Sequence, residues 1–262
     1  MPFVTRDGRP LFYREEGSGG PPILLVHGWC CDHTYMAPQI EHLASAHRVI
    51  APDLSGHGRS DASPQVYTMG GFADELAWLA RHLALDRPVV IGHSMGGGIA
   101  LELSARHPDV PAAIAMLDST IVVSAERRAR MEALLPLFRA PGYRDAMRDA
   151  LEAGFFQPWD NPERRARIVE AMTAAPQHVV AGAWQGILEW NGAAATAACK
   201  VPALYVASSA PRTDLARMRQ LCPQLLTAQI VGAGHFVQLE VPEQVNAMLD
   251  RFQMLAQARP GR

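Results

Sequence analysis

Residues 92–96, with the sequence Gly-His-Ser-Met-Gly, constrain the fold of this chain more than any other segment. They follow the apolar run 88–91 and lead into a stretch of helical character at 95–106. A Gly-x-Ser-x-Gly sequence between a strand and a helix is typical of a strained turn that lifts the serine hydroxyl clear of the sheet. The positive end of the helix would also stabilise an oxyanion formed there. The segment therefore predicts a nucleophile at Ser94.

Strand-like and helical stretches alternate along the rest of the chain. Six apolar runs show little polar alternation, which is typical of parallel strands covered on both faces: 22–27, 47–53, 88–92, 112–118, 201–207 and 225–231. Helical stretches are expected at 35–45, 70–85, 95–106, 214–221 and 241–256. This order predicts an α/β fold with a doubly wound, mostly parallel sheet. Ligands of such folds bind beyond the carboxyl ends of the strands, where this chain carries His27, Asp53, Ser94, Asp118 and His235.

Residues 121–192 interrupt the alternation with amphipathic helical stretches in which arginines stand among apolar residues. We expect them to form a helical cap, inserted into an α/β core that consists of residues 1–120 and 193–262. Aromatic side chains are concentrated in this cap. With Trp29, they are expected to line a substrate pocket: Phe138, Phe155, Phe156, Trp159 and Trp184. Packing of the cap helices against one another is the alternative role for each of them.

Composition and charge limit the classes of partner. The formal net charge is −2, and no cluster of basic residues is long enough to favour nucleic acid or an anionic membrane surface. No run approaches the roughly 18 apolar residues of a membrane span, and the first residues lack a signal-peptide pattern. We therefore expect a soluble, cytoplasmic protein that acts on a small molecule. The sequence neither requires nor excludes a homo-oligomer.

Neither a metal ion nor an organic cofactor is expected. The four cysteines lack the C-x-x-C spacing and the histidine pairing of a zinc site, so we interpret them as reduced thiols: Cys30, Cys31, Cys199 and Cys222. No glycine-rich phosphate-binding motif stands in the strand-to-helix context that it requires.

Four motifs occur in a familiar order: 25–29 (Leu-Val-His-Gly-Trp), 52–61 (Pro-Asp-Leu-Ser-Gly-His-Gly-Arg-Ser-Asp), 92–97 (Gly-His-Ser-Met-Gly-Gly) and 232–236 (Gly-Ala-Gly-His-Phe). With them, nearly the whole chain resembles the α/β-hydrolase superfamily, in its small esterase, lactonase and perhydrolase-like branch. The resemblance implies a serine nucleophile, a histidine base after the last strand, and an oxyanion hole made by two backbone amides. One of these amides is implied to come from the His-Gly-Trp loop.

A serine hydroxyl is a poor nucleophile at neutral pH and needs a base within hydrogen-bond reach. His235 is the candidate base, because it follows a glycine-rich turn at the end of the last apolar run. The backbone amides of Trp29 and Met95 are the candidate oxyanion donors. The other histidines near the motifs are expected to brace loops or to fill tight turns, with one exception. His33 is the one that could overhang the pocket.

Two aspartates compete to be the acid of the triad. Many members of the resembled family place it after the penultimate strand, but the corresponding position here is Ala210. Asp214 follows shortly afterwards, yet its position also suits a helix N-cap. Asp118 ends the strand that follows the predicted elbow helix, where some family members place the acid. We favour Asp118, whose alternative role is to cap its own loop.

These assignments predict a two-step acyl transfer. Ser94, activated by His235, would attack the carbonyl of a carboxylic ester, thioester or lactone, and water would then release the acid from the acyl-serine. Three alternatives fit the same fold. They are a hydrolase of carbon–carbon bonds, a cofactor-free oxygenase that does not require Ser94, and a ligand receptor with little turnover.

Overall fold

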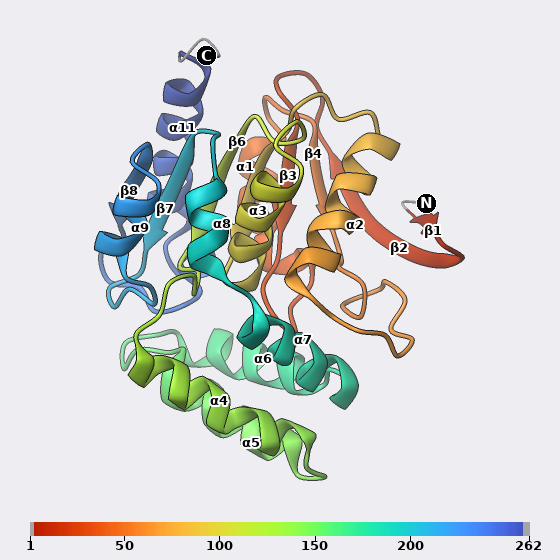
Figure 1. The fold of residues 1–262 in the computed structure, drawn as a ribbon, viewed down its shortest axis with the longest axis vertical. Coiled ribbons are helices and arrows are strands. Elements are labelled where there is room, and N and C mark those ends of the chain that lie inside the picture. The colour runs from red at the N-terminus through yellow and green to blue at the C-terminus, as the bar shows by residue number, and fades with distance from the viewer. Residues whose placement is uncertain (1–2, 259–262) are drawn as a thin grey trace.

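The structure is a computed structural model that describes residues 3–258. Within these residues a single eight-stranded sheet has the order β1-β2-β4-β3-β5-β6-β7-β8 (Figure 1). The strands are β1 (Phe3–Arg6), β2 (Arg9–Glu16), β3 (Ile23–Val26), β4 (Val49–Pro52), β5 (Val89–His93), β6 (Ala113–Leu117), β7 (Ala203–Ala207) and β8 (Leu225–Gln229). The pairs from β4 to β8 are parallel, whereas β2 pairs antiparallel with both β1 and β4.

The central strands are covered on both faces, as their unbroken apolar sequences predict. Every residue of β3 is buried, and its side chains contribute alternately to the two cores. Leu24 and Val26 belong to one hydrophobic cluster, and Ile23 and Leu25 belong to the other. This is the period-two alternation of a strand, with apolar partners on each side. The predicted six parallel strands are confirmed.

The strands β1 and β2 were not predicted from the sequence. In β1, exposed residues alternate with half-buried ones, and β2 carries arginines and glutamates among its apolar residues. Antiparallel strands at the edge of a sheet need only one buried face, so they lack the continuous apolar run that marks the central strands.

Helices cover both faces of the sheet. On one face lie α2 (Met69–His82), α3 (Met95–Arg106) and α8 (Gly192–Ala198), and α3 contacts both of the others. On the other face, α1 (Ala37–Leu43) contacts α11 (Pro242–Gln257). The remaining short helices are η1 (His33–Met36), α9 (Leu215–Leu221) and α10 (Val237–Glu240). The long helices on the sheet, α2, α3 and α11, each bury apolar residues, which is the doubly wound arrangement expected.

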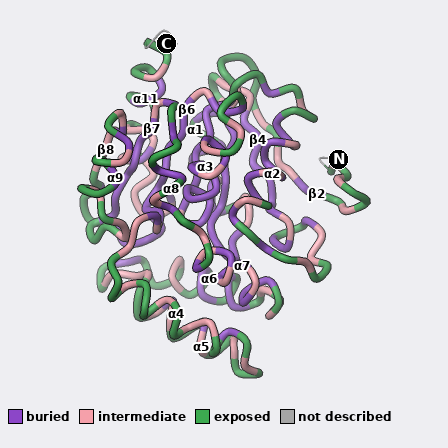
Figure 2. The backbone as a smooth tube through the Cα atoms, in the orientation of Figure 1, coloured by how far each residue is buried: buried purple, intermediate pink, exposed green. Residues whose placement is uncertain are grey.

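Four of the five helices between β6 and β7 form a layer beyond one end of the strands (Figure 1). They are α4 (Ala125–Arg139), α5 (Tyr143–Gly154), α6 (Pro162–Thr173) and α7 (Gln177–Glu189). In Figure 2 α4 and α5 are largely exposed or intermediate, in contrast to the buried strands. The predicted α/β fold with an inserted helical cap is confirmed. The division of the chain into core and cap at residues 121 and 192 stays a prediction.

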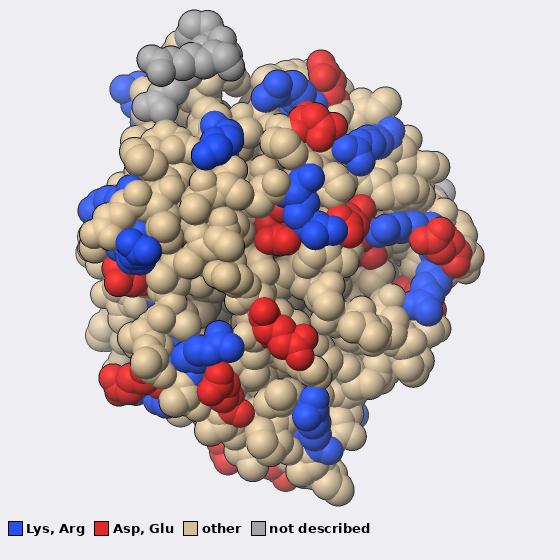
Figure 3. Space-filling model, viewed as in Figure 1, with Lys and Arg blue, Asp and Glu red and all other residues tan. Residues whose placement is uncertain are grey.

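The surface carries charges of both signs. On the face seen in Figure 3, basic and acidic side chains are interspersed among other residues, with no continuous patch of either kind. Between residues 3 and 258, none of the helices is both long and apolar enough to cross a membrane.

Candidate active site

Ser94 stands at the tight turn between β5 and α3. Its φ of 53° lies in the left-handed region, which is strained for a residue with a side chain. The close backbone packing around this turn explains the flanking glycines. A β-carbon at Gly92 would lie 2.2 Å from the carbonyl carbon of Gly96, and one at Gly96 would lie 2.3 Å from the carbonyl oxygen of Val26. The turn is therefore compatible only with glycine at these two positions.

The imidazole of His235 bridges two side chains that are distant in sequence. Its Nε2 lies 2.9 Å from Oγ of Ser94, and its Nδ1 lies 2.8 Å from Oδ2 of Asp118. Ser94 follows β5, Asp118 follows β6, and His235 lies in the loop after β8. Parallel strands bring these three carboxyl ends to the same edge of the sheet, beneath the cap.

Asp118 is fully buried and its carboxylate is surrounded by N–H donors. The backbone N–H of Ser208 donates to Oδ1 at 3.1 Å, and Nε of Arg212 donates to Oδ2 at 3.2 Å. Burial raises the pKa of Asp118, whereas the Arg212 guanidinium and the backbone N–H and side-chain hydroxyl of Ser208 lower it. These donors stabilise the ionised carboxylate in a site that water does not reach.

Burial lowers the pKa of His235 well below its ordinary value, and the positive charges of Arg212 and Arg127 act in the same direction. The imidazole is therefore neutral at pH 7. A neutral ring that donates from Nδ1 to Asp118 presents a lone pair on Nε2 to Ser94. This is the tautomer that a general base needs.

Two residues that line the cavity with Ser94 have backbone N–H groups without an acceptor among the described residues. Within residues 3–258, neither the N–H of Trp29 nor that of Met95 donates a hydrogen bond. Met95 is the first residue of α3, so its N–H lies at the positive end of the helix. The loop after β3, which carries Trp29, lies against the nucleophile, since a β-carbon at Gly28 would be 3.3 Å from Cβ of Ser94. This arrangement fits the predicted oxyanion hole.

Two buried histidines brace the loops of the site, as expected. Nε2 of His27 accepts from the N–H of Leu54 at 3.0 Å, which joins the loop after β3 to the loop after β4. Nε2 of His93 lies 2.9 Å from the carbonyl oxygen of His235 and so supports the loop that carries the candidate base. Burial lowers the pKa of both rings, which keeps them neutral.

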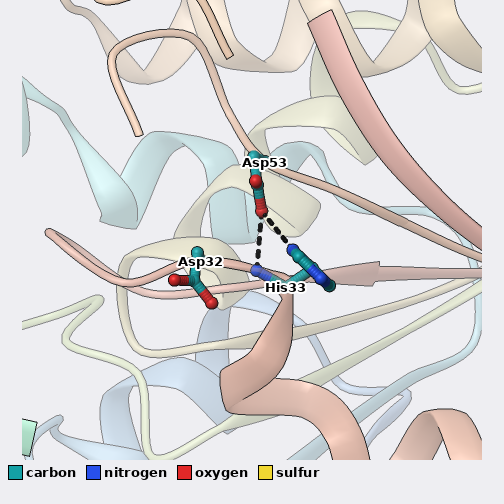
Figure 4. Close-up of side chains that lie close together, drawn as sticks. All are labelled: Asp32, His33 and Asp53. Carbon is teal, nitrogen blue, oxygen red and sulfur yellow. Dashed lines mark hydrogen bonds and ion pairs between the residues drawn. The ribbon is translucent and has the colours of Figure 1, made fainter. Parts of the chain in front are cut away.

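Asp32, His33 and Asp53 lie together where the loop after β3 meets the loop after β4 (Figure 4). Oδ1 of Asp53 accepts from the backbone N–H of His33 at 2.8 Å and faces its Nδ1 at 2.7 Å, while Oδ2 accepts from the N–H of Arg59. Asp32 caps η1 by accepting from the N–H of Thr34. Both Asp53 oxygens are thus engaged in bracing loops. The expectation that His33 overhangs the pocket is wrong, because its ring points to Asp53.

A cavity opens between the edge of the sheet and the cap. The side chains that line it are mostly apolar and come from both layers: Trp29, Cys31, Met69, Met95, Met131, Phe155, Met172, Trp184, Ile187 and Phe236. Ser94 and His235 lie in the same lining, together with Thr120, Arg127 and Arg212. Three of the predicted lining residues, Trp29, Phe155 and Trp184, are therefore at the cavity. The Phe155 ring lies edge-on to the His235 imidazole, with 4.5 Å between centroids.

The other three predicted lining residues lie elsewhere, and these expectations are corrected. Phe138 is fully buried behind the wall, where it packs on Trp29 and Trp184. Phe156 stacks on Phe236 outside the lining. Trp159 is 62% exposed, and its indole N–H donates to the carbonyl of Gly232. For these residues, packing or surface contact is the observed role.

Asp214 has the alternative role that its sequence context suggested. Its side chain accepts from the backbone N–H of Arg217 at 2.9 Å and caps α9. Of the two candidate acids, Asp118 is the one that contacts His235.

The two arginines of the cavity were not anticipated from the sequence. Arg212 follows β7 and pairs with Asp118, 94 residues earlier, so no local pattern could reveal the contact. Arg127 lies in the first turn of α4, among several arginines that helical periodicity alone does not distinguish.

Comparison with known proteins agrees with this geometry. A sequence profile described as the alpha/beta hydrolase fold matches residues 21–242, and the chain belongs to this family. It is 27% identical, over 94% of its length, to the dihydrolipoyllysine-residue acetyltransferase component of the acetoin cleaving system of Pseudomonas putida, of which it spans 67%. Further curated relatives, 36% identical over 48% of this chain, are matched over only 35% of their own length.

Solved structures are similar over almost the entire chain. A thermophilic esterase from Thermogutta terrifontis has a TM-score of 0.84 and 28% identity, covering 97% of both chains. Est816, described as an N-acyl homoserine lactone degrading enzyme, has a TM-score of 0.81 and 28% identity, covering 96% of this chain and 100% of its own. The chain is thus a hydrolase of the α/β family, similar to esterases and lactonases.

Proposed function

We propose that this protein cleaves a small carboxylic ester, thioester or lactone through an acyl-serine intermediate. The observation that carries the proposal is the bridge formed by His235, 2.9 Å from Oγ of Ser94 and 2.8 Å from Oδ2 of Asp118. The similarity to an esterase and to a lactone-degrading enzyme supports the same substrate class.

The reaction follows from the positions of these groups. Nε2 of His235 takes the proton of Ser94 as Oγ attacks the carbonyl carbon, and Asp118 stabilises the imidazolium that forms. The N–H groups of Trp29 and Met95 stabilise the oxyanion of the tetrahedral intermediate. His235 returns the proton to the leaving alcohol or thiol, or to the ring oxygen of an opened lactone. It then activates a water that releases the acid from Ser94.

A fluorophosphonate probe followed by peptide mapping tests the nucleophile. We expect the label on Ser94 in the wild type and no label in Ser94→Ala. Short p-nitrophenyl esters and a panel of lactones, assayed in parallel, test the reaction. Turnover that persists in Ser94→Ala would contradict the proposal and favour chemistry that does not need the serine. Cleavage of diketone acids with no cleavage of esters would instead indicate a carbon–carbon bond hydrolase.

A further inference from the structure

The cavity beneath the cap has an unbalanced charge. Arg127 and Arg212 are the two charged side chains in its lining, and no aspartate or glutamate of the described residues 3–258 lines it with them. The rest of the wall is largely apolar, so each guanidinium needs a partner to offset the loss of water on one side. The two arginines differ in whether the protein supplies that partner.

Arg212 has an anionic partner within the protein. Its Nε donates to Oδ2 of Asp118, another of its nitrogens donates to the carbonyl of Gly154, and the guanidinium lies 4.6 Å from the Phe155 ring centroid. The charge of Arg212 is therefore offset by Asp118. Its position is set by contacts with both the core and the cap.

The side chain of Arg127 has no such partner. The backbone N–H of Arg127 receives the cap from Ser124, but in the part of the chain that is described its guanidinium makes no hydrogen bond or ion pair. Its neighbours on α4 are paired. Arg128 contacts Glu132 at 2.9 Å, and Arg130 contacts Glu126 at 3.0 Å. Arg127 is thus a half-buried cation that lines the same cavity as Ser94.

We propose that Arg127 binds a carboxylate carried by the substrate, so that the preferred substrate is an ester, thioester or lactone with one negative charge away from the reacting carbonyl. This inference rests on the proposed function and adds a substrate class to it. One uncompensated guanidinium balances a monoanion, and its planar fork matches the two oxygens of a carboxylate. Arg127 and Ser94 share a largely apolar cavity lining, which suits the hydrocarbon chain that would join the carboxylate to the scissile bond.

The test uses pairs of esters that differ only in charge. Monomethyl succinate, glutarate and adipate are compared with their neutral amide analogues, in which the free carboxylate is replaced by a carboxamide. The wild type is expected to show a higher kcat/KM for the anion of at least one pair. In Arg127→Gln the ratio of anionic to neutral kcat/KM for that pair should fall about 10- to 100-fold, the range for a charge-assisted hydrogen bond. Arg127→Lys should retain part of the preference.

Arg130→Gln is the matched control, because Arg130 lies on the same helix but is 67% exposed and paired with Glu126. It should keep the wild-type ratio. An unchanged ratio in Arg127→Gln, or a wild type that prefers every neutral amide, would overturn the inference.

Calorimetry with Ser94→Ala separates this inference from the proposed reaction. In that background, the monoester of the preferred length is expected to bind more tightly than its amide, and the difference should disappear when Arg127→Gln is added. This outcome would support the anion site even if no ester were hydrolysed. The absence of hydrolysis would contradict only the proposed reaction. Equal binding of acid and amide would show Arg127 to be a surface cation only and would overturn the inference.

Discussion

Nε of Arg212 donates to Oδ2 of Asp118 at 3.2 Å, and this is the same oxygen that lies 2.8 Å from Nδ1 of His235. The acid of the candidate triad is therefore held from two directions. The N–H of Ser208 fixes its other oxygen. Asp118 itself has a φ of 43°, so a strained backbone carries the acid as well as the nucleophile. The arginine positions this carboxylate and adds a positive charge near the base.

Replacing Arg212 should change the pH profile. In Arg212→Leu the loss of a positive charge raises the pKa of His235, so the acidic limb of kcat/KM should move to higher pH. Steady-state rates between pH 4 and 8 measure this shift. Arg217→Leu is the control, because Arg217 lies on exposed α9 and contacts Gln220. An acidic limb that stays in place in Arg212→Leu would contradict this electrostatic role.

Substitution by asparagine should have very different effects at the two candidate acids. Asp118→Asn is expected to lose on the order of 10⁴-fold in kcat, because an amide cannot hold the required histidine tautomer or stabilise its cation. Asp214→Asn should keep full turnover, since asparagine also caps helices well. Ester hydrolysis by the purified variants measures both effects. Collapse of Asp214→Asn with survival of Asp118→Asn would reverse the assignment of the acid.

The N-cap role of Asp214 gives a separate prediction about stability. Asp214→Ala should lower the free energy of unfolding by about 1 kcal/mol, because it removes the acceptor for the Arg217 N–H at the start of α9. Urea titration followed by circular dichroism measures the change. Turnover per folded molecule should equal that of the wild type. A loss of turnover without a loss of stability would be the opposite of this expectation.

Removal of the nucleophile should abolish turnover without unfolding the protein. Ser94→Ala is expected to lose on the order of 10⁶-fold in kcat, the size of effect seen when the serine of such a triad is removed. The serine hydroxyl forms a hydrogen bond only with His235 among the described side chains, so thermal unfolding should shift little. Turnover assays and calorimetry on the same preparation separate the two effects.

Buried His57 should make stability depend on acidity. Burial lowers the pKa of His57 to about 3, whereas an unfolded histidine keeps its ordinary value near 6.5. Between these values the unfolded state binds the extra proton. This contribution to stability is therefore present above pH 6.5 and is lost as the pH falls toward 3. The slope is about 1.4 kcal/mol per pH unit for one such group.

The measurement compares the free energy of unfolding at pH 4, 5 and 6 in the wild type and in His57→Gln, which cannot titrate. The pH dependence of the variant should be shallower by that slope. His42→Gln is the control, because the exposed side chain of His42 has Asp250 as its only hydrogen-bond partner among the described residues. Parallel curves for the wild type and His57→Gln would refute the linkage.

Much of the fold was predictable because its signals are local. A buried parallel strand requires an unbroken apolar run, and all six such runs became strands of the sheet. The antiparallel strands β1 and β2 escaped prediction, because a strand with one buried face can carry charged residues such as those of Arg9–Glu16. The turn around Ser94 was predictable for a related reason. Backbone packing at Gly92 and Gly96 excludes any side chain, so the glycines of the motif themselves indicate the tight turn.

The site depended on contacts that no local pattern encodes. The sequence allowed either Asp118 or Asp214 as the partner of His235. Asp118 reaches the imidazole because the carboxyl ends of β6 and β8 lie at the same edge of the folded sheet. The positions of the cap aromatics could not be predicted either. Periodicity marks an apolar helix face, but it does not indicate whether that face meets the cavity or another helix. Trp159, although aromatic, is exposed.

Short motifs thus identify the serine, the histidine and the class of fold, because each motif reflects a constraint on a few neighbouring residues. The identity of the acid, the pairing of Arg212 and the place of Arg127 in the cavity lining emerge only when strands and helices far apart in the chain pack together. Electrostatic partners are chosen by proximity in three dimensions, and proximity is a property of the packed molecule.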